Sequence, residues 1–188
     1  MEPEKLNRDT VKELLKDIES EHIERTISTN AVKKYSEAIC AFSNDFRNTG
    51  RNGYLLIGVK DNGELNGLQA TDKLLRNLGS LRSEGNILPQ PIMTVQRFRF
   101  PKGDIAVIEV QPSPFPPVRY RGKTWIRVGP RKAIANIQEE RILTERRSAN
   151  VSMFDIRPNA EATLDDLQIE VFRDQYLPKA IPQELLQT

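Results

Sequence analysis

The sequence predicts an α+β fold: a curved, mixed or antiparallel sheet with helices packed mainly on one face. Three observations lead to this expectation. Apolar residues recur with helical spacing in four segments, short apolar or alternating runs typical of strands lie between them, and tight turns join several of those runs. Because strands joined by a tight turn run in opposite directions, the hairpins should make much of the sheet antiparallel.

The first 50 residues predict helix, strand and helix in that order. Thr10 is placed to cap a helix that runs to about residue 18, with Glu13 in the capping-box position. Residues 21–28 alternate between polar and apolar, as in a strand. Asn30 is placed to cap the second helix. The expected inner stripe of that helix is Val32, Tyr35, Ala38, Ile39 and Phe42.

A buried strand and a tight turn should follow. Residues 55–59 form a short apolar run, typical of a strand that is covered on both faces. Asp61, Asn62 and Gly63 supply turn chemistry, so we expect Asp61 to be exposed where the strand ends. Thr71 then caps a third helix that continues through Leu81.

The second half predicts two hairpins and a final helix. Residues 92–100 alternate and turn back into a strand at 105–110. The prolines of 112–117 interrupt the sheet because proline donates no backbone hydrogen bond. Residues 118–128 form a second hairpin around Arg121-Gly122-Lys123, and a helix is expected from about 134 to 147.

Length and composition predict a single domain at residues 1–147, with 148–188 a linker or the start of a following domain in a longer protein. No apolar run approaches the roughly 20 residues that cross a bilayer. The acidic, polar N-terminus does not resemble a signal peptide. One cysteine, Cys40, and one histidine, His22, disfavour a zinc site. These features point to the cytoplasm and to no membrane partner.

Charge is unevenly distributed along the chain, although the net charge is only +2. Residues 1–24 carry −4, residues 97–147 carry +7 and residues 148–188 carry −4. A basic segment between acidic ends is a candidate for phosphate contact. An ordinary solvated face, paired with the acidic ends, explains the same pattern, and charge alone does not decide between them.

Five motifs together resemble one known family, the Schlafen-type AlbA domain, over about residues 10–147. They occur in the family's order at residues 19–24, 42–44, 53–63, 125–129 and 139–140. The resemblance implies a nucleic-acid-binding module of a bacterial transcriptional regulator or ATPase-associated protein, with DNA favoured over RNA as partner. ATP binding would belong to other domains of the full-length protein, and no cofactor is implied for this module.

Basic residues in one loop and one hairpin are the candidate nucleic-acid contacts. Arginine binds phosphate in a fork, and alternate residues of a hairpin share a face. Tyr120 and Trp125 lie among them and suit base stacking. The alternative is that Trp125 belongs to the core and that Tyr120 covers an edge. The candidates are Arg51, Arg119, Arg121, Lys123, Arg127, Arg131 and Lys132.

Two alternative functions remain open. The resemblance extends to Schlafen proteins that are RNA endonucleases, which would make Glu19, Glu24 and Asp61 a catalytic trio holding Mg²⁺ or Mn²⁺. Here Arg25 and Thr26 stand where the family usually has Phe and Lys. The three carboxylates could equally cap or pair at the surface. The third function is protein interaction or homo-oligomerisation through an amphipathic helix at 164–176.

Overall fold

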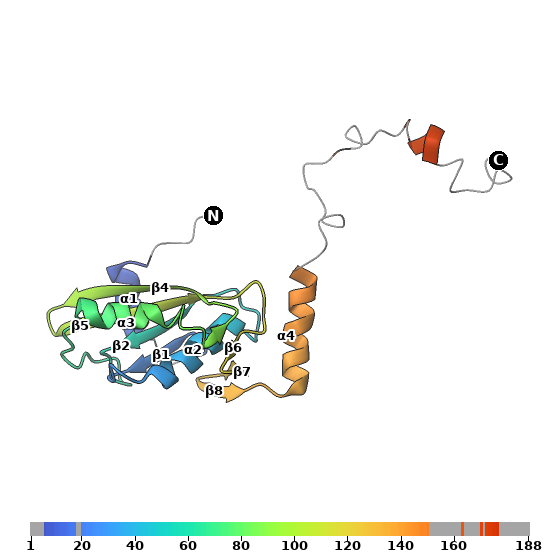
Figure 1. Ribbon diagram of the computed structural model, residues 1–188. Coiled ribbons are helices and arrows are strands. Elements are labelled where there is room, and N and C mark those ends of the chain that lie inside the picture. The colour runs from blue at the N-terminus through green and yellow to red at the C-terminus, as the bar shows by residue number, and fades with distance from the viewer. Residues whose placement is uncertain (1–5, 18–19, 151–162, 164–169, 171, 177–188) are drawn as a thin grey trace. The chain divides into compact units, whose positions relative to one another are not determined.

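The computed structural model describes residues 6–17, 20–150, 163, 170 and 172–176 (Figure 1). The chain divides into two units, Met1–Val151 and Ser152–Thr188. In the second unit the element described is a π-helical turn, η3, at Phe172–Tyr176. Most of the helix predicted at 164–176 therefore lies outside the described residues.

The described strands of the first unit form two sheets of four. The first sheet has the order β1 (Ile23–Thr26), β2 (Gly53–Ile57), β5 (Gly103–Gln111) and β4 (Ile92–Phe100). The second has the order β3 (Ile87–Leu88), β6 (Arg119–Tyr120), β7 (Lys123–Val128) and β8 (Arg131–Ile134). β1 and β2 are parallel, and the other pairs are antiparallel. The α+β class and the mixed sheet are confirmed, but the strands divide between two sheets.

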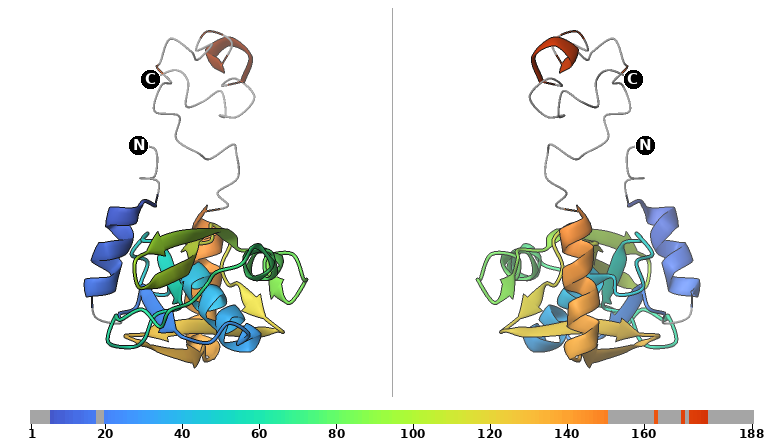
Figure 2. Two further views of the ribbon diagram at one scale, coloured as in Figure 1. Left: turned by 90° about the vertical axis from the view of Figure 1, so that its left-hand side faces the viewer. Right: turned by 90° about the vertical axis from the view of Figure 1, so that its right-hand side faces the viewer.

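Four α-helices accompany these sheets in the described chain: α1 (Arg8–Lys16), α2 (Val32–Asn44), α3 (Asp72–Ser80) and α4 (Ile137–Asn150). α2 and α3 pack into a core with one face of the first sheet, and residues of the second sheet complete that core. α1 packs against the opposite face of the first sheet, as Figure 2 shows. Two helices thus share one face and one covers the other.

The central strand β2 is buried on both faces, as the apolar run predicted. Leu55 and Ile57 lie in the core beneath α2, while Leu56 lies in the core beneath α1. The expected turn follows it: the Lys60 amide donates to the carbonyl of Glu64 at 2.8 Å. Asp61 is exposed in this turn, which confirms that prediction.

The residue that caps the helix start was predicted correctly for α3 but not for α1 or α2. Thr71 caps α3 as expected, because its hydroxyl accepts from the Leu74 amide. Thr10 does not cap α1. The Asn7 side chain accepts from the amides of Asp9 and Thr10, so a strong capping residue one turn earlier starts the helix. The predicted cap Asn30 was also wrong: its side-chain oxygen accepts from the Ser28 hydroxyl.

The strand β8 was not predicted, and it replaces the expected start of the last helix. Its four residues pair with β7, with Trp125 opposite Ile134 and Val128 opposite Arg131. α4 begins three residues later, where the Asn136 side chain accepts from two amides of the first turn. Of the helices described, none is long and apolar enough to span a membrane.

Candidate nucleic-acid interface

The motif at residues 42–44 builds the junction between α2 and the second sheet. Asn44 is buried, and its amide nitrogen donates to the carbonyls of Val118 at 2.9 Å and Trp125 at 2.7 Å. Its oxygen accepts from the Val118 amide at 2.7 Å. One side chain therefore satisfies three buried backbone groups and fixes the entry to β6 and the middle of β7 relative to α2.

Gly53 completes this junction on the first sheet. A Cβ at this position would lie 2.2 Å from Cγ of Phe42, so no larger residue fits unless the ring moves. The glycine lets β2 approach α2 closely, which is a packing role rather than a turn role. Motif residues Phe42, Asn44 and Gly53 thus act together as a structural clamp.

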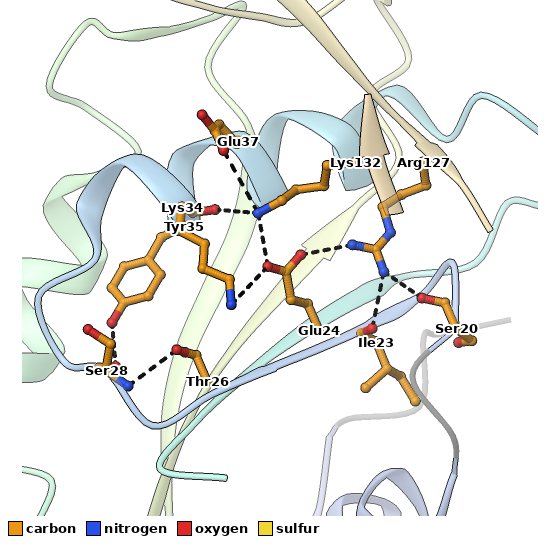
Figure 3. A network of polar contacts seen from close by, with 10 residues as sticks. All are labelled: Ser20, Ile23, Glu24, Thr26, Ser28, Lys34, Tyr35, Glu37, Arg127 and Lys132. Carbon is orange, nitrogen blue, oxygen red and sulfur yellow. Dashed lines mark hydrogen bonds and ion pairs between the residues drawn. The ribbon is translucent and has the colours of Figure 1, made fainter. Parts of the chain in front are cut away.

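Glu24 is the centre of a buried ion-pair network between β1, α2, β7 and β8 (Figure 3). Its Oε2 accepts from Nη1 of Arg127 at 2.8 Å, and its Oε1 accepts from Nζ of Lys132 at 2.9 Å. Lys34 approaches Oε1 at 3.8 Å. Arg127 also donates to the carbonyls of Ser20 and Ile23. The negative charge of Glu24 and the positive charge of Arg127 therefore neutralise each other inside the fold.

The predicted carboxylate trio does not assemble from the residues described. Glu24 faces α2 and the second sheet. Its neighbour Arg25 faces the other side of β1, where its guanidinium donates to the carbonyls of Leu14 and Asp61. Asp61 therefore lies on the side of β1 away from the Glu24 carboxylate. Glu19 lies outside the described residues.

These contacts do not fit a metal site at Glu24. Both oxygens of Glu24 already accept from cationic side chains, and a divalent ion would have to displace them. In the described part of the chain, no three acidic, histidine or cysteine side chains are grouped to hold a metal.

Two predicted phosphate contacts are interior residues instead. Arg127 is 6 % exposed and binds Glu24, and its guanidinium lies 5.3 Å from the centre of the Phe42 ring. The Lys132 side chain is 14 % exposed and is held by Glu24, Glu37 and the Lys34 carbonyl. Alternation placed Arg127 on a strand, whereas Lys132 lies on β8, which was not predicted. α2 covers the face on which both side chains lie.

Arg131 and Arg51 are both exposed, and Arg131 lies apart from the tip of the hairpin. Arg131 pairs with Val128, at the other end of β7 from Lys123. Five strand steps separate those ends, or about 17 Å. Arg51 follows a loop whose amides are already used, because the Asp45 carboxylate accepts from the amides of Thr49 and Gly50. That loop therefore offers no free amides at these positions to a phosphate.

The β6–β7 hairpin does carry exposed positive charge. Arg121 and Lys123 are exposed, and neither has an ion-pair partner among the described residues. Arg121 sits at the turn with φ 47° and stacks 5.5 Å from the centre of the Tyr120 ring. Arg119 is half-buried, and its Nη2 pairs with Glu140 of α4 at 3.4 Å.

A cavity of about 510 Å³ lies between this hairpin, β3 and α4, and we call it the arginine groove. Its walls include Arg119, Arg121 and Arg147, together with Asn86, Leu88 and Pro89. None of the described residues that line it is acidic. The groove is therefore a concave surface with fixed positive charge, which concentrates field lines on an anion.

Arg147 was not among the predicted contacts, although the basic segment 97–147 ends on it. α4 is held in place by its neighbour Arg146, whose guanidinium donates to the carbonyls of Asp45 at 2.8 Å and Phe46 at 2.9 Å. Glu140 ties the start of the same helix to β7 by accepting from the Thr124 hydroxyl. These contacts bring Arg147 to the hairpin, a proximity that the spacing along the chain does not reveal.

Comparison with known proteins identifies the family. The family model described as Schlafen, AlbA_2 matches residues 19–136. No curated protein matches the chain. The N-terminal domain of an ATP-dependent DNA helicase RecG-related protein from Nitrosomonas europaea is 26 % identical, with 55 % of this chain and 71 % of that chain covered and a TM-score of 0.43.

The DIP2311 protein from Corynebacterium diphtheriae is 16 % identical, with 88 % of this chain and 36 % of that chain covered and a TM-score of 0.47. The family model, rather than these two structures, carries the assignment, since it covers most of the first unit and all of the clamp formed by Phe42, Asn44 and Gly53. The chain belongs to the Schlafen AlbA_2 family.

Proposed function

We propose that this domain is a non-enzymatic nucleic-acid-binding module that holds the phosphate backbone in the arginine groove. The observation that carries the proposal is the groove itself, in which three arginines from two elements face a cavity without an acidic lining residue. Guanidinium groups bind phosphate oxygens in a bidentate manner, and a concave wall lets several of them contact neighbouring phosphates.

The exposed charges of the hairpin extend this surface. Lys123 lies one strand position from the turn that carries Arg121, so a backbone leaving the groove meets a further cation. Arg119 is partly neutralised by Glu140, which makes Arg121, Lys123 and Arg147 the principal contacts. Binding of this kind is mainly electrostatic and carries little base specificity, because phosphates are the same in every sequence.

The proposal includes the ligand and the kind of protein in which the domain acts. The family resemblance supports DNA as the first ligand to test and a role in a bacterial transcriptional regulator or beside an ATPase domain. The buried partners of Glu24 favour this binding function over the metal-dependent nuclease.

The decisive variant combines Arg121→Ala with Arg147→Ala. Binding of labelled DNA is followed by fluorescence anisotropy across a range of salt concentrations. We expect weaker binding to all sequences and a salt slope that is shallower by about 1.4–1.8, because each lost phosphate contact removes roughly 0.7 on single strands and 0.9 on duplex.

A matched control removes the same charge elsewhere. Arg99 and Lys102 are exposed beside the β4–β5 turn, which lies at the opposite end of the first unit from the hairpin (Figure 1). Arg99→Ala with Lys102→Ala should leave the slope close to that of the unchanged protein. If both double variants lose affinity and salt slope equally, the arginine groove is rejected as the binding site. If the unchanged protein binds neither DNA nor RNA at low salt, the proposed function is rejected.

A further inference from the structure

A second cavity, of about 270 Å³, lies on the other side of the same hairpin, and we call it the aromatic pocket. Its lining includes Tyr120, Arg121, Trp125 and Ile134, with Lys33 and Glu37 contributed by α2. Tyr120 is almost fully buried, Trp125 is partly exposed, and Ile134 is 50 % exposed. An apolar, aromatic wall therefore opens to solvent beside a rim of cations.

The two cavities share one lining residue. Arg121 lines both the arginine groove and the aromatic pocket. Lys123 and Lys33 add positive charge around the pocket. The carboxylate in its lining, Glu37, is already approached by Lys132 at 3.9 Å, so it does not stand as a free negative charge. A ligand with an anionic part in the groove can thus place a flat, uncharged part in the pocket.

A nucleotide has this combination of parts. Its base is a flat ring with two π-faces, which stacks on aromatic side chains whatever its sequence, and its phosphate suits arginine. In a duplex the faces of each base are covered by its neighbours and its edge by its partner, so a paired base cannot enter such a pocket. Only an unpaired base is free to do so.

We propose that the aromatic pocket accepts one unpaired nucleobase, so that the domain binds single-stranded nucleic acid in preference to duplex. This inference rests on the proposed function, because the groove must hold the adjoining phosphate. DNA and RNA strands share the required chemistry, since both present an unpaired base beside a phosphate.

The chain contains a single tryptophan, so tryptophan fluorescence reports on this pocket alone. The probes are oligothymidylate, an abasic deoxyribose-phosphate strand of the same length, oligouridylate, and a duplex. Oligothymidylate should quench the emission of Trp125 and bind at least about fivefold more tightly than the abasic strand, as expected from one stacked base. The abasic strand and the duplex should bind in a salt-dependent manner without quenching. Quenching by oligouridylate shows whether RNA is also accepted.

Two variants separate stacking from folding. Trp125→Leu should lose about fivefold or more in affinity for oligothymidylate while binding the abasic strand unchanged, and Trp125→Phe should restore most of the loss because a ring is again present. Circular dichroism confirms that each variant is folded. The quenching experiment on the unchanged protein stands even if Trp125→Leu does not fold.

The outcomes distinguish the two proposals. If oligothymidylate and the abasic strand bind equally and the emission of Trp125 stays unchanged, the base pocket is rejected while electrostatic binding in the groove survives. If neither strand binds at low salt, both the groove and the pocket are rejected. Equal quenching by duplex and single strand would also overturn the preference for unpaired bases.

Discussion

Glu24 is a buried carboxylate that the fold surrounds with cations from α2, β7 and β8. Its side chain is 7 % exposed and that of its partner Arg127 is 6 % exposed, so neither charge is stabilised by bulk water. Such a pair contributes little beyond a well-packed apolar pair, but it becomes costly when one partner is removed. The cost arises because the remaining charges stay buried.

Replacing Glu24 with Gln should therefore destabilise the protein by about 3 kcal/mol, because Arg127 loses its counter-charge and Lys132 keeps only Glu37 at 3.9 Å. Urea unfolding monitored by circular dichroism measures the change. Glu13→Gln is the control, since Glu13 pairs with Lys16 in an exposed position and should leave the midpoint unchanged. A Glu24→Gln protein as stable as the original would show that the network does not hold the sheets together.

This stability effect bears on how the nuclease alternative is tested. Loss of any cleavage activity in Glu24→Gln would not by itself assign catalysis to the carboxylate, because partial unfolding would remove activity as well. Asp61→Asn is the cleaner variant, since Asp61 is exposed in its turn and its side chain supports no buried contact among the described residues.

At the level of elements, the junction of α2 with β6 and β7 depends on Asn44. Asn44→Ala should cost about 2–4 kcal/mol, because it removes the side-chain partner of the Val118 amide and of the Trp125 carbonyl and leaves the Val118 carbonyl with only the weak Cys40 thiol as donor. Thermal and urea denaturation both measure this loss.

Asn62→Ala provides the matched control for that substitution. Asn62 lies in the exposed turn after β2, and its side chain hydrogen-bonds the amide and the carboxylate of nearby Glu64, both at the surface. Its replacement should shift the unfolding midpoint much less. Similar losses in both variants would mean that the clamp at Asn44 is not a special feature of the fold.

Elements with strong local signals could be predicted from the sequence. Alternation and turn residues located β4 and β5, and Thr71 located the start of α3. β8 and β3 were missed because two to four residues are too few to show a period. The Asn7 cap was missed because Thr10 offered a second plausible start within one turn of helix.

The candidate site was harder to predict than the elements that carry it. Alternation correctly placed Arg127 on a strand, but its burial depends on contact with Glu24, which is 103 residues away in the chain. The proximity of Arg147 to the hairpin depends likewise on where α4 is anchored. Local patterns assign a side chain to a face of its element, whereas the fold decides what covers that face.

Across the whole molecule, the basic segment 97–147 serves two different purposes. Arg97 and Arg146 donate to backbone carbonyls, and Arg127 and Lys132 neutralise Glu24. The net charge of that segment therefore overstates the charge available to a ligand. Of the remainder, Arg121, Lys123 and Arg147 lie around the β6–β7 hairpin, whereas Arg99 and Lys102 lie beside the distant β4–β5 turn. Under the proposed function, a small number of substitutions at the hairpin should therefore remove most of the binding.

The reactivity of the buried Cys40 thiol should measure cooperative unfolding of the first unit. Burial raises the pKa of its thiol from 9.0 to about 12, so the native state keeps the thiol protonated where the unfolded state ionises. The resulting stability is fully present below pH 9 and is lost as the pH rises from 9 towards 12. Alkylation at pH 8 should therefore be slow and should follow the rate of global unfolding.

The matched control moves the thiol to the surface. Cys40→Ala combined with Lys102→Cys places it in the exposed β4–β5 turn, where alkylation should be fast and independent of denaturant. Fast labelling of Cys40 in the native protein would show that α2 opens locally, without unfolding of the whole unit.

The long sequence separation within the Glu24 network has a consequence for how the protein is made. A ribosome synthesises Glu24 103 residues before Arg127 and 108 residues before Lys132. β1 and α2 leave the exit tunnel early, but the Glu24 carboxylate of β1 cannot be paired until Arg127 of β7 and Lys132 of β8 have been synthesised. The nascent chain should therefore acquire its native arrangement in one late step, after β8 has emerged, rather than by the stepwise completion of its N-terminal half.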